Sequence, residues 1–451
     1  MSVRGKDIFG FNAAGYPGDI VFSYDDLTIE HPEFMKLDGS IYKKAQYPQI
    51  EKFFNYASVN PLETIIPISE TVVTKATGTK EMQFFFAEGD DVTFVFVSEK
   101  TSGASYGYIT TLVSHDRGET FEINKYTTQV RFRPGLRTGV AVKNGNVIYI
   151  VYRDTTTALA DVYIEVMYTY DLGKTWKYEN LNRSDKSTKY DVSLLTSNGR
   201  AYMRYQSGSD HIFLTKLLDE NTTGGNGWEQ IDISNIANDS LFHRIANSDK
   251  LILGGISNGT FRIINGDGTY TDHPTHSFSV SKFDHSKIFY KNGLYLFVYP
   301  QYNSADGRLY STADFNNWGE EVMAAPEFGN DDSSYNVYAC DYKDYSIFKG
   351  DGGVSILLRD VDNYSKRGAS AALYRSGFSG IGILNKVYTE KETGRDYLIS
   401  FEKLVEDTKV TYYTLKCYLK DPKDYFKISS SYLNSKITGC SSDQYPFIRA
   451  E

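Results

Sequence analysis

Two copies of one eight-residue pattern, 55 positions apart, constrain the fold of this 451-residue chain more than any other feature. Residues 114–121 read SHDRGETF, and residues 169–176 read TYDLGKTW. A short apolar stretch with the residue types of a β-strand precedes each copy. The spacing equals one four-stranded antiparallel sheet, since a strand with its turn takes roughly 10 to 14 residues. The pattern therefore predicts a fold built from repeated four-stranded sheets.

Each copy predicts a tight turn between two strands, not a catalytic site. The Asp side chain can accept hydrogen bonds from backbone N–H groups of the turn, and the hydroxyls can satisfy further groups. The Gly can adopt the positive φ that the reversal requires. The final aromatic residue begins the returning strand, and we expect it to pack between neighbouring sheets. The structural residues are Ser114, Asp116, Gly118, Thr120 and Phe121 in the first copy, and Thr169, Asp171, Gly173, Thr175 and Trp176 in the second.

The pattern resembles the Asp-box, or BNR repeat, of sialidases and related β-propellers. A shortened copy occupies residues 311–318, with Asp314 and Trp318. Degenerate hairpins follow the same order, and the third strand of each unit is expected near residues 107, 162, 211, 259, 307, 370 and 411. We predict an all-β fold: a β-propeller of seven blades, or alternatively six, over residues 61–451, behind a small α+β module over residues 1–60.

The composition agrees with a fold of short strands. The chain has 37 Tyr, 27 Phe and 37 Gly but only 11 Pro, which favours strands separated by glycine-containing turns. Apolar strand pairs surround Asn144-Gly145, Asn292-Gly293 and Gly352-Gly353, which are typical hairpin turns.

Charge and motif content exclude several functions. The formal net charge is −9 and no long basic run occurs, so we expect no nucleic-acid binding. No window approaches 18 consecutive apolar residues, and the N-terminus lacks the apolar core of a signal peptide. We therefore expect no membrane insertion, and synthesis in the cytoplasm without a signal peptide. The three cysteines lack metal-ligand spacing, so we predict no metal and no cofactor.

The N-terminal segment carries a second resemblance. Residues 18–23 read GDIVFS, residues 34–42 read FMKLDGSIY, and residues 47–54 begin YPQI and end in Phe53-Phe54. This order resembles the tail-collar-type module of phage tail fibres, although Leu37 stands where many members have Cys. The resemblance implies a location in the virion tail and attachment to other tail proteins. An ordinary small α+β cap on the propeller is the alternative.

Candidate contact residues are loop arginines and tyrosines. Three interpretations of Arg131, Arg133 and Arg137 are open. They are solvent-facing turn residues, they bind an anionic sugar, or they bind a substrate carboxylate in a catalytic site. Tyrosine rings stack well on sugars, which adds Tyr152 with its neighbour Arg153, and Tyr299 with Tyr302. We predict a phage tail-fibre or receptor-binding protein that binds a host-surface glycan or protein, as a homo-oligomer with a trimer favoured. The alternatives are a virion-associated, sialidase-like glycan depolymerase, for which no catalytic residue is assigned, and a structural tail or adapter protein.

Overall fold

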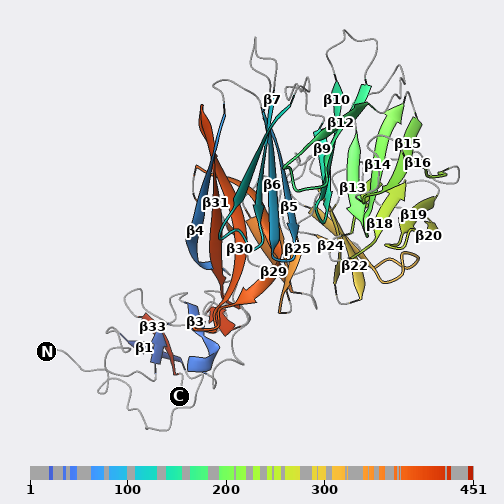
Figure 1. The fold of residues 1–451 in the computed structure, drawn as a ribbon. Coiled ribbons are helices and arrows are strands. Elements are labelled where there is room, and N and C mark those ends of the chain that lie inside the picture. Colours follow the sequence, from blue (N-terminus) through green and yellow to red (C-terminus); the bar gives the residue numbers. More distant parts are fainter. Residues whose placement is uncertain are drawn as a thin grey trace. The chain divides into compact units, whose positions relative to one another are not determined.

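The structure is a computed structural model of the full chain, and Figure 1 shows its fold. It describes residues 20–23, 34–36, 41–47, 62–75, 81–98, 107–128, 139–154, 163–180, 192–207, 210–219, 227–233, 241–245, 248–254, 260–274, 287–291, 293–300, 307–319, 322–323, 339–343, 345–349, 355–360, 370–372, 375, 377–421, 424–427 and 445–449. Apart from one 3-10 turn, Lys44–Gln46, the regular elements of these residues are all β-strands.

The chain divides into two compact units. The small unit comprises Met1–Glu63 together with Leu419–Glu451, and the large unit comprises Thr64–Tyr418. In the small unit β33 (Tyr445–Arg449) lies between β1 (Ile20–Ser23) and β2 (Phe34–Lys36), and β3 (Ile41–Lys43) pairs with β32 (Tyr425–Lys427). Strands from both ends of the chain therefore form its sheets. The helix predicted from Tyr47 to Phe54 lies outside the described residues, except for Tyr47 itself.

Five four-stranded antiparallel sheets make up much of the large unit, and the strands of each follow one another in the sequence. Sheet 1 is β5 (Glu81–Glu88), β6 (Asp91–Ser98), β7 (Gly107–Ser114) and β8 (Glu122–Thr128). Sheet 2 is β9 (Gly139–Asn144), β10 (Val147–Asp154), β11 (Tyr163–Thr169) and β12 (Lys177–Asn180). Sheet 3 is β13 (Ser193–Ser197), β14 (Arg200–Ser207), β15 (Asp210–Leu217) and β16 (Glu229–Gln230). Sheet 4 is β17 (Leu241–Arg244), β18 (Leu251–Gly254), β19 (Thr260–Ile264) and β20 (Tyr270–Pro274). Sheet 5 is β21 (Lys287–Lys291), β22 (Leu294–Pro300), β23 (Gly307–Thr312) and β24 (Val322–Met323).

Two further four-stranded sets are joined by one parallel pair, Asp341 with Lys386. Sheet 6 is β25 (Ala339–Tyr342), β26 (Tyr345–Lys349), β27 (Ser355–Asp360) and β28 (Ser370–Ala372). Sheet 7 is β29 (Ser379–Thr389), β30 (Asp396–Val405), β31 (Lys409–Leu419) and, as its outer strand, β4 (Leu62–Thr74). The fold is all-β, with multiple four-stranded antiparallel sheets of the kind that form propeller blades.

Sheet 7 combines strands from opposite ends of the large unit. The backbone N–H of Lys75, just after β4, donates to the carbonyl of Thr408, just before β31, at 2.8 Å. The end of β4 therefore lies at the start of β31, which makes the pair antiparallel (Figure 1). Tyr425–Lys427, the next described strand after β31, does not join sheet 7 but pairs with β3 in the small unit.

Sheet 6 also differs from prediction. The third strand expected near residue 370 is the fourth, β28, and the third is β27. The first hairpin of this sheet was missed because its turn has no Gly: Lys343 itself takes a positive φ of 50° between β25 and β26. The third strands of the other units lie where the repeat predicted them, at β7, β11, β15, β19, β23 and β31.

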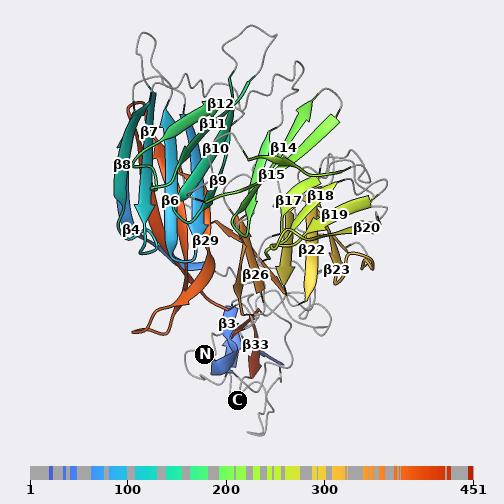
Figure 2. The same cartoon turned by 45° about the vertical axis from the view of Figure 1, so that its right-hand side comes forward.

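The first strands of the sheets lie next to one another in sequence order. β5 contacts β9, β9 contacts β13, β13 contacts β17, and β17 contacts β21, while β29 contacts both β25 and β5. Figure 2 shows several of these strands from a second angle. Sheet 7 is therefore a direct neighbour of sheet 1, although 290 or more positions separate β5 from β29 in the sequence.

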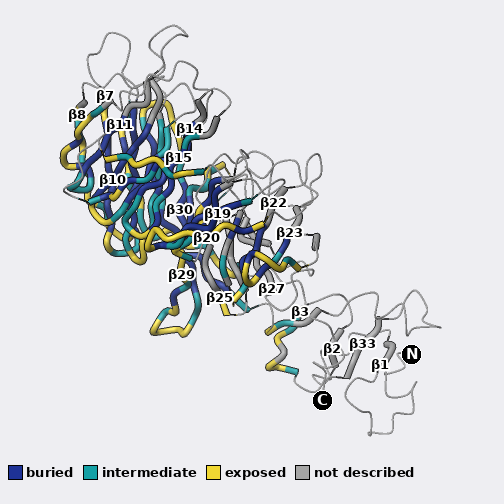
Figure 3. The backbone as a smooth tube through the Cα atoms, turned by 90° about the vertical axis from the view of Figure 1, so that its right-hand side faces the viewer, coloured by how far each residue is buried: buried dark blue, intermediate teal, exposed yellow. Residues whose placement is uncertain are grey.

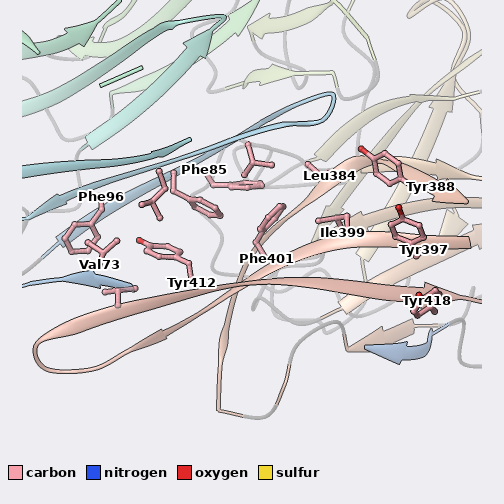
Figure 4. Close-up of a cluster of buried hydrophobic side chains, with 14 residues drawn as sticks. Val73, Phe85, Phe96, Leu384, Tyr388, Tyr397, Ile399, Phe401, Tyr412 and Tyr418 are labelled. Atoms are coloured by element: carbon pink, nitrogen blue, oxygen red, sulfur yellow. The ribbon is translucent and has the colours of Figure 1, made fainter. Parts of the chain in front are cut away.

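The core lies between neighbouring sheets. Figure 4 shows the cluster between sheets 1 and 7, with Phe401 and Tyr412 among the labelled residues. Phe94 belongs to the same cluster, and its ring centroid lies 5.5 Å from that of Phe401 and 5.0 Å from that of Tyr412. Val73 of β4 joins the same cluster and is 1% exposed. Burying each such side chain stabilises the fold by about 1.5–3 kcal/mol. Figure 3 shows the same distribution along the chain, with buried stretches in the strands and exposed positions at the turns.

Candidate functional site

The turn between β7 and β8 is held by the side chain of Asp116. Its Oδ1 accepts from Ser114 Oγ (2.7 Å) and from the backbone N–H of Thr120 (2.9 Å). Its Oδ2 accepts from Thr120 Oγ1 at 2.6 Å. Ser114 Oγ in turn accepts from the backbone N–H groups of Asp116 and Gly118, at 3.3 and 2.8 Å. Every polar atom of this turn that the pattern supplies is used inside the turn.

The turn between β11 and β12 repeats this network atom for atom. Asp171 Oδ1 accepts from Thr169 Oγ1 (2.7 Å) and Thr175 N (2.9 Å), and its Oδ2 accepts from Thr175 Oγ1 (2.6 Å). Thr169 Oγ1 accepts from the N–H groups of Asp171 and Gly173, at 3.2 and 3.0 Å. Asp116 and Asp171 thus have equivalent surroundings at the same corner of consecutive sheets.

The carboxylates of these turns are stabilised as anions. Burial raises the pKa of Asp116, but the hydrogen bonds from Thr120 and Ser114 outweigh this and lower it to about 2. The same balance, with Thr175 and Thr169 as the donors, lowers the pKa of Asp171. A carboxylate that accepts this many bonds and stays ionised acts as a structural acceptor.

The glycine of each turn lies where the neighbouring sheet leaves no room for a side chain. Gly173 has φ +90°, and a Cβ there would lie 2.1 Å from Thr111 Oγ1 of sheet 1. Gly118 has φ +82°, and its Cβ would lie 2.7 Å from side-chain atoms of both Phe401 and Thr414 in sheet 7. These positions require Gly for two independent reasons, backbone conformation and space.

The aromatic residues of the turns pack between sheets. Trp176 is buried in a cluster with Val95 and Ile109 of sheet 1. Phe121 lies against the cluster shared by sheets 1 and 7, with its ring 5.7 Å from Phe94. Trp318 packs against Phe297 of its own sheet at 4.8 Å and Phe261 of sheet 4 at 6.4 Å.

The third turn is one residue shorter and uses a different residue for the reversal. Asp314 Oδ1 accepts from the N–H groups of Asn316 and Asn317, at 2.9 and 2.8 Å. Thr312 Oγ1 accepts from the N–H of Phe315, whose own φ is +62°. Phe315 is buried, so its side chain offsets the cost of this backbone conformation through packing.

The three predicted contact residues that the structure describes, Tyr152, Arg153 and Tyr299, lie at the other end of the strands. Tyr152 and Arg153 are near the end of β10, where Tyr152 pairs with Gly139 at the start of β9. Thr169, which begins the second Asp-box turn, pairs instead with Ile148 near the start of β10.

Tyr299, near the end of β22, pairs with Arg308 at the start of β23, whereas Thr312 at the end of β23 pairs with Tyr295. The structure describes the backbone of Tyr152, Arg153 and Tyr299; Arg131, Arg133, Arg137 and Tyr302 lie outside the described residues.

A charged group that the sequence did not reveal lies at this same end of sheet 7. Glu402 is fully buried and accepts from the backbone N–H and Nε of Arg375, at 3.0 and 2.5 Å. The Arg375 guanidinium lies over the rings of Phe378 and Tyr413, at 4.1 and 4.4 Å. No motif connects Arg375 with Glu402, because they meet only through the pairing of β29 with β30.

The described residues contain no group of three or more His, Cys, Asp or Glu able to hold a metal ion. Within the same residues, no helix has the length and apolar character needed to cross a bilayer.

Comparison with known proteins concerns the fold. No protein-family model matches the sequence, and no curated protein sequence matches it. Among solved structures, virginiamycin B lyase of Staphylococcus aureus has a TM-score of 0.39 at 11% identity, over 77% of this chain and 99% of the other. This chain is structurally similar to β-propeller proteins. The Trypanosoma rangeli sialidase gives 0.36 at 12% identity (76% of this chain, 60% of the other), and the α-L-arabinofuranosidase Arb93A of Fusarium graminearum gives 0.35 at 10% (80% and 98%). These three TM-scores are low, so the description of the fold is based on the sheets of this chain and not on the solved structures.

Proposed function

We propose that this protein is a bacteriophage tail-fibre or receptor-binding protein whose seven sheets form a closed, seven-bladed propeller. In this proposal β4 closes the ring as the outer strand of the seventh blade. The small unit attaches the protein to other tail proteins, and the propeller binds a host-surface glycan or protein. Symmetric attachment in a tail favours a trimer.

One topological observation carries the proposal. The chain enters the large unit at the start of β4 and leaves it at the end of β31, and these two points lie together because the strands are antiparallel. The end of β31 also lies at the end of the sheets that carries the Asp-box turns, since Arg117 of the first such turn donates to the Tyr397 hydroxyl, and the Tyr397 ring lies 6.1 Å from that of Tyr418 near the end of β31. Both covalent connections to the small unit therefore leave from the Asp-box end.

The opposite end of the sheets is free of these connections. It carries the ends of β10 and β22, with Tyr152, Arg153 and Tyr299, and the starts of the first strands. Loops at one end of such sheets present their side chains as a group. This arrangement fits a protein that is attached through the Asp-box end of its sheets and binds its ligand at the opposite end.

The small unit supports the attachment role. Its sheets join β1, β2 and β3 to β32 and β33, so both ends of the chain belong to one unit. The β1 strand falls within the GDIVFS segment that resembles the tail-collar module. This resemblance is the reason for proposing the virion tail as the location.

Binding can be tested with the labelled full-length protein on panels of bacterial cells and arrayed bacterial surface polysaccharides. Tyr152→Ala, Arg153→Ala and Tyr299→Ala should weaken binding by tenfold or more if these residues contact the ligand. Lys174→Ala in the second Asp-box turn, where the side chain is 58% exposed, is the matched control and should bind like the wild type.

Two outcomes would contradict the proposal. Binding lost in the Lys174→Ala control but kept in the other variants would place the contact at the Asp-box end. Shortening of a polysaccharide during incubation would replace a binding protein with a depolymerase, which is the alternative function.

A further inference from the structure

The small unit is built from two halves of the chain, Met1–Glu63 before the large unit and Leu419–Glu451 after it. β1 and β2 pair with the two edges of β33, and β3 pairs with β32 (Figure 1). Among the strands that the structure describes, none of β1, β2 and β3 pairs with another of the three. Each described sheet of the small unit therefore needs strands from both halves.

The three-stranded sheet depends on β33. Ile448 pairs with Ile20 of β1 on one side and with Met35 of β2 on the other, and Phe447 is also paired on both sides. Both flanking strands are antiparallel to β33, so β1 and β2 run parallel to each other. A parallel pair needs a crossover of a dozen or more residues, whereas only residues 24–33 separate β1 from β2. In this arrangement β1 and β2 cannot replace β33 by pairing with each other.

The proline of β33 lies where this strand has a described neighbour on one side only. Pro446 pairs with Phe22 of β1, whereas the pairing with β2 begins at Phe447. Proline lacks the N–H that a strand with two neighbours uses, so it is tolerated at an edge position and not at a central one. Phe447 and Ile448 are the central positions of the sheet, and a proline at either position should break it.

The large unit brings the two halves of the small unit together. It begins at Thr64 in β4 and ends at Tyr418 in β31, and these two points lie together because β4 and β31 are antiparallel. A folded connection that holds two segments close gives them a high effective concentration for pairing. Closing the same loop across an unfolded connection is opposed by chain entropy. The pairing of Ile20 with Ile448, 428 positions later, is therefore favoured once β4 has paired with β31.

We propose that the small unit forms only in chains that contain β33 and in which β4 has closed sheet 7. A chain that stops before residue 445 leaves β1 and β2 without their shared partner strand. A chain with an unfolded large unit leaves the two halves far apart. The consequence for assembly, that only chains with a folded large unit are attached to the tail, rests on the proposed function, but the order of pairing does not.

The first test compares hydrogen exchange, measured by mass spectrometry, in the full-length protein and in Phe447→Pro. We expect β1 and β2 to exchange slowly in the wild type and about tenfold faster or more in the variant, while sheets 1 to 5 keep their protection. Phe447→Leu is the matched control, because it keeps the backbone N–H and an apolar side chain, and it should exchange like the wild type. Unchanged exchange of β1 and β2 in Phe447→Pro would overturn the proposal. Loss of protection across sheets 1 to 5 would also overturn it, because the large unit would then depend on the small one.

The second test uses the wild type alone and does not depend on the folding of a variant. Hydrogen exchange is measured at increasing urea concentrations, and β1 should lose protection at or below the concentration at which β4 and β31 lose theirs. Protection of β1 that persists after β4 has unfolded would overturn the proposal. Neither test involves a tail protein or a ligand, so failure of this proposal leaves the proposed function standing, and the reverse also holds.

Discussion

Replacing Gly173 by Ala tests whether the Asp-box turns set the distance between sheets. Ala at φ +90° places its Cβ against the backbone, at a cost of about 1–2 kcal/mol. The same Cβ would lie 2.1 Å from Thr111 Oγ1, so sheets 1 and 2 must separate or Thr111 must move. Overpacking of this kind costs about 1–3 kcal/mol. We expect Gly173→Ala to lower the free energy of unfolding by about 2–5 kcal/mol.

Gly268→Ala is the matched control. Gly268 has φ +86°, but a Cβ there would meet no atom within 4 Å, so this variant carries the backbone cost alone. Urea unfolding followed by tryptophan fluorescence gives both values. Thr111→Ala removes the hydroxyl and methyl that the new Cβ would strike, and it should recover part of the loss in Gly173→Ala while giving none in Gly268→Ala. Equal destabilisation by the two glycine substitutions, or no recovery by Thr111→Ala, would refute the close approach of the sheets.

Two further predictions concern closure and pH. Val73→Ala in β4 should cost about 1–3 kcal/mol because Val73 is 1% exposed between sheets 1 and 7, whereas Val72→Ala, 42% exposed on the other face, should change stability by less than about 0.5 kcal/mol in the same urea assay. Asp116→Asn should destabilise the protein at pH 7, and the difference from wild type should shrink as pH falls from about 4 towards 2. Folding lowers the pKa of Asp116, so the ionised carboxylate stabilises the folded protein at pH values above the pKa of Asp116 in the unfolded chain, and this contribution is lost as the pH falls. A difference in unfolding free energy between wild type and Asp116→Asn that does not change with pH would contradict this.

Local patterns predicted the hairpins well. The residues of each Asp-box turn act within a few positions of one another, so the hydrogen bonds of Asp116 and Asp171 can be inferred from sequence alone. The Asn-Gly turn at Asn144-Gly145 joins β9 to β10 for the same reason. The shorter turn at Asp314 shows the limit of the pattern, because Phe315 replaces Gly at positive φ.

Long-range pairing could not be predicted. Nothing near Leu62–Thr74 in the sequence indicates that this strand pairs with Lys409–Leu419, since the two share no turn. The partners Arg375 and Glu402 meet for a similar reason, through the register of β29 and β30.

A crystal structure of the full-length protein tests the central claim, a closed ring of seven sheets, most directly. The electron density is to be viewed along the axis of the proposed ring. We predict seven radial four-stranded sheets in a closed ring, with residues 62–74 as the outer strand beside residues 409–419. Two layers of sheets packed face to face, or residues 62–74 paired elsewhere, would contradict it.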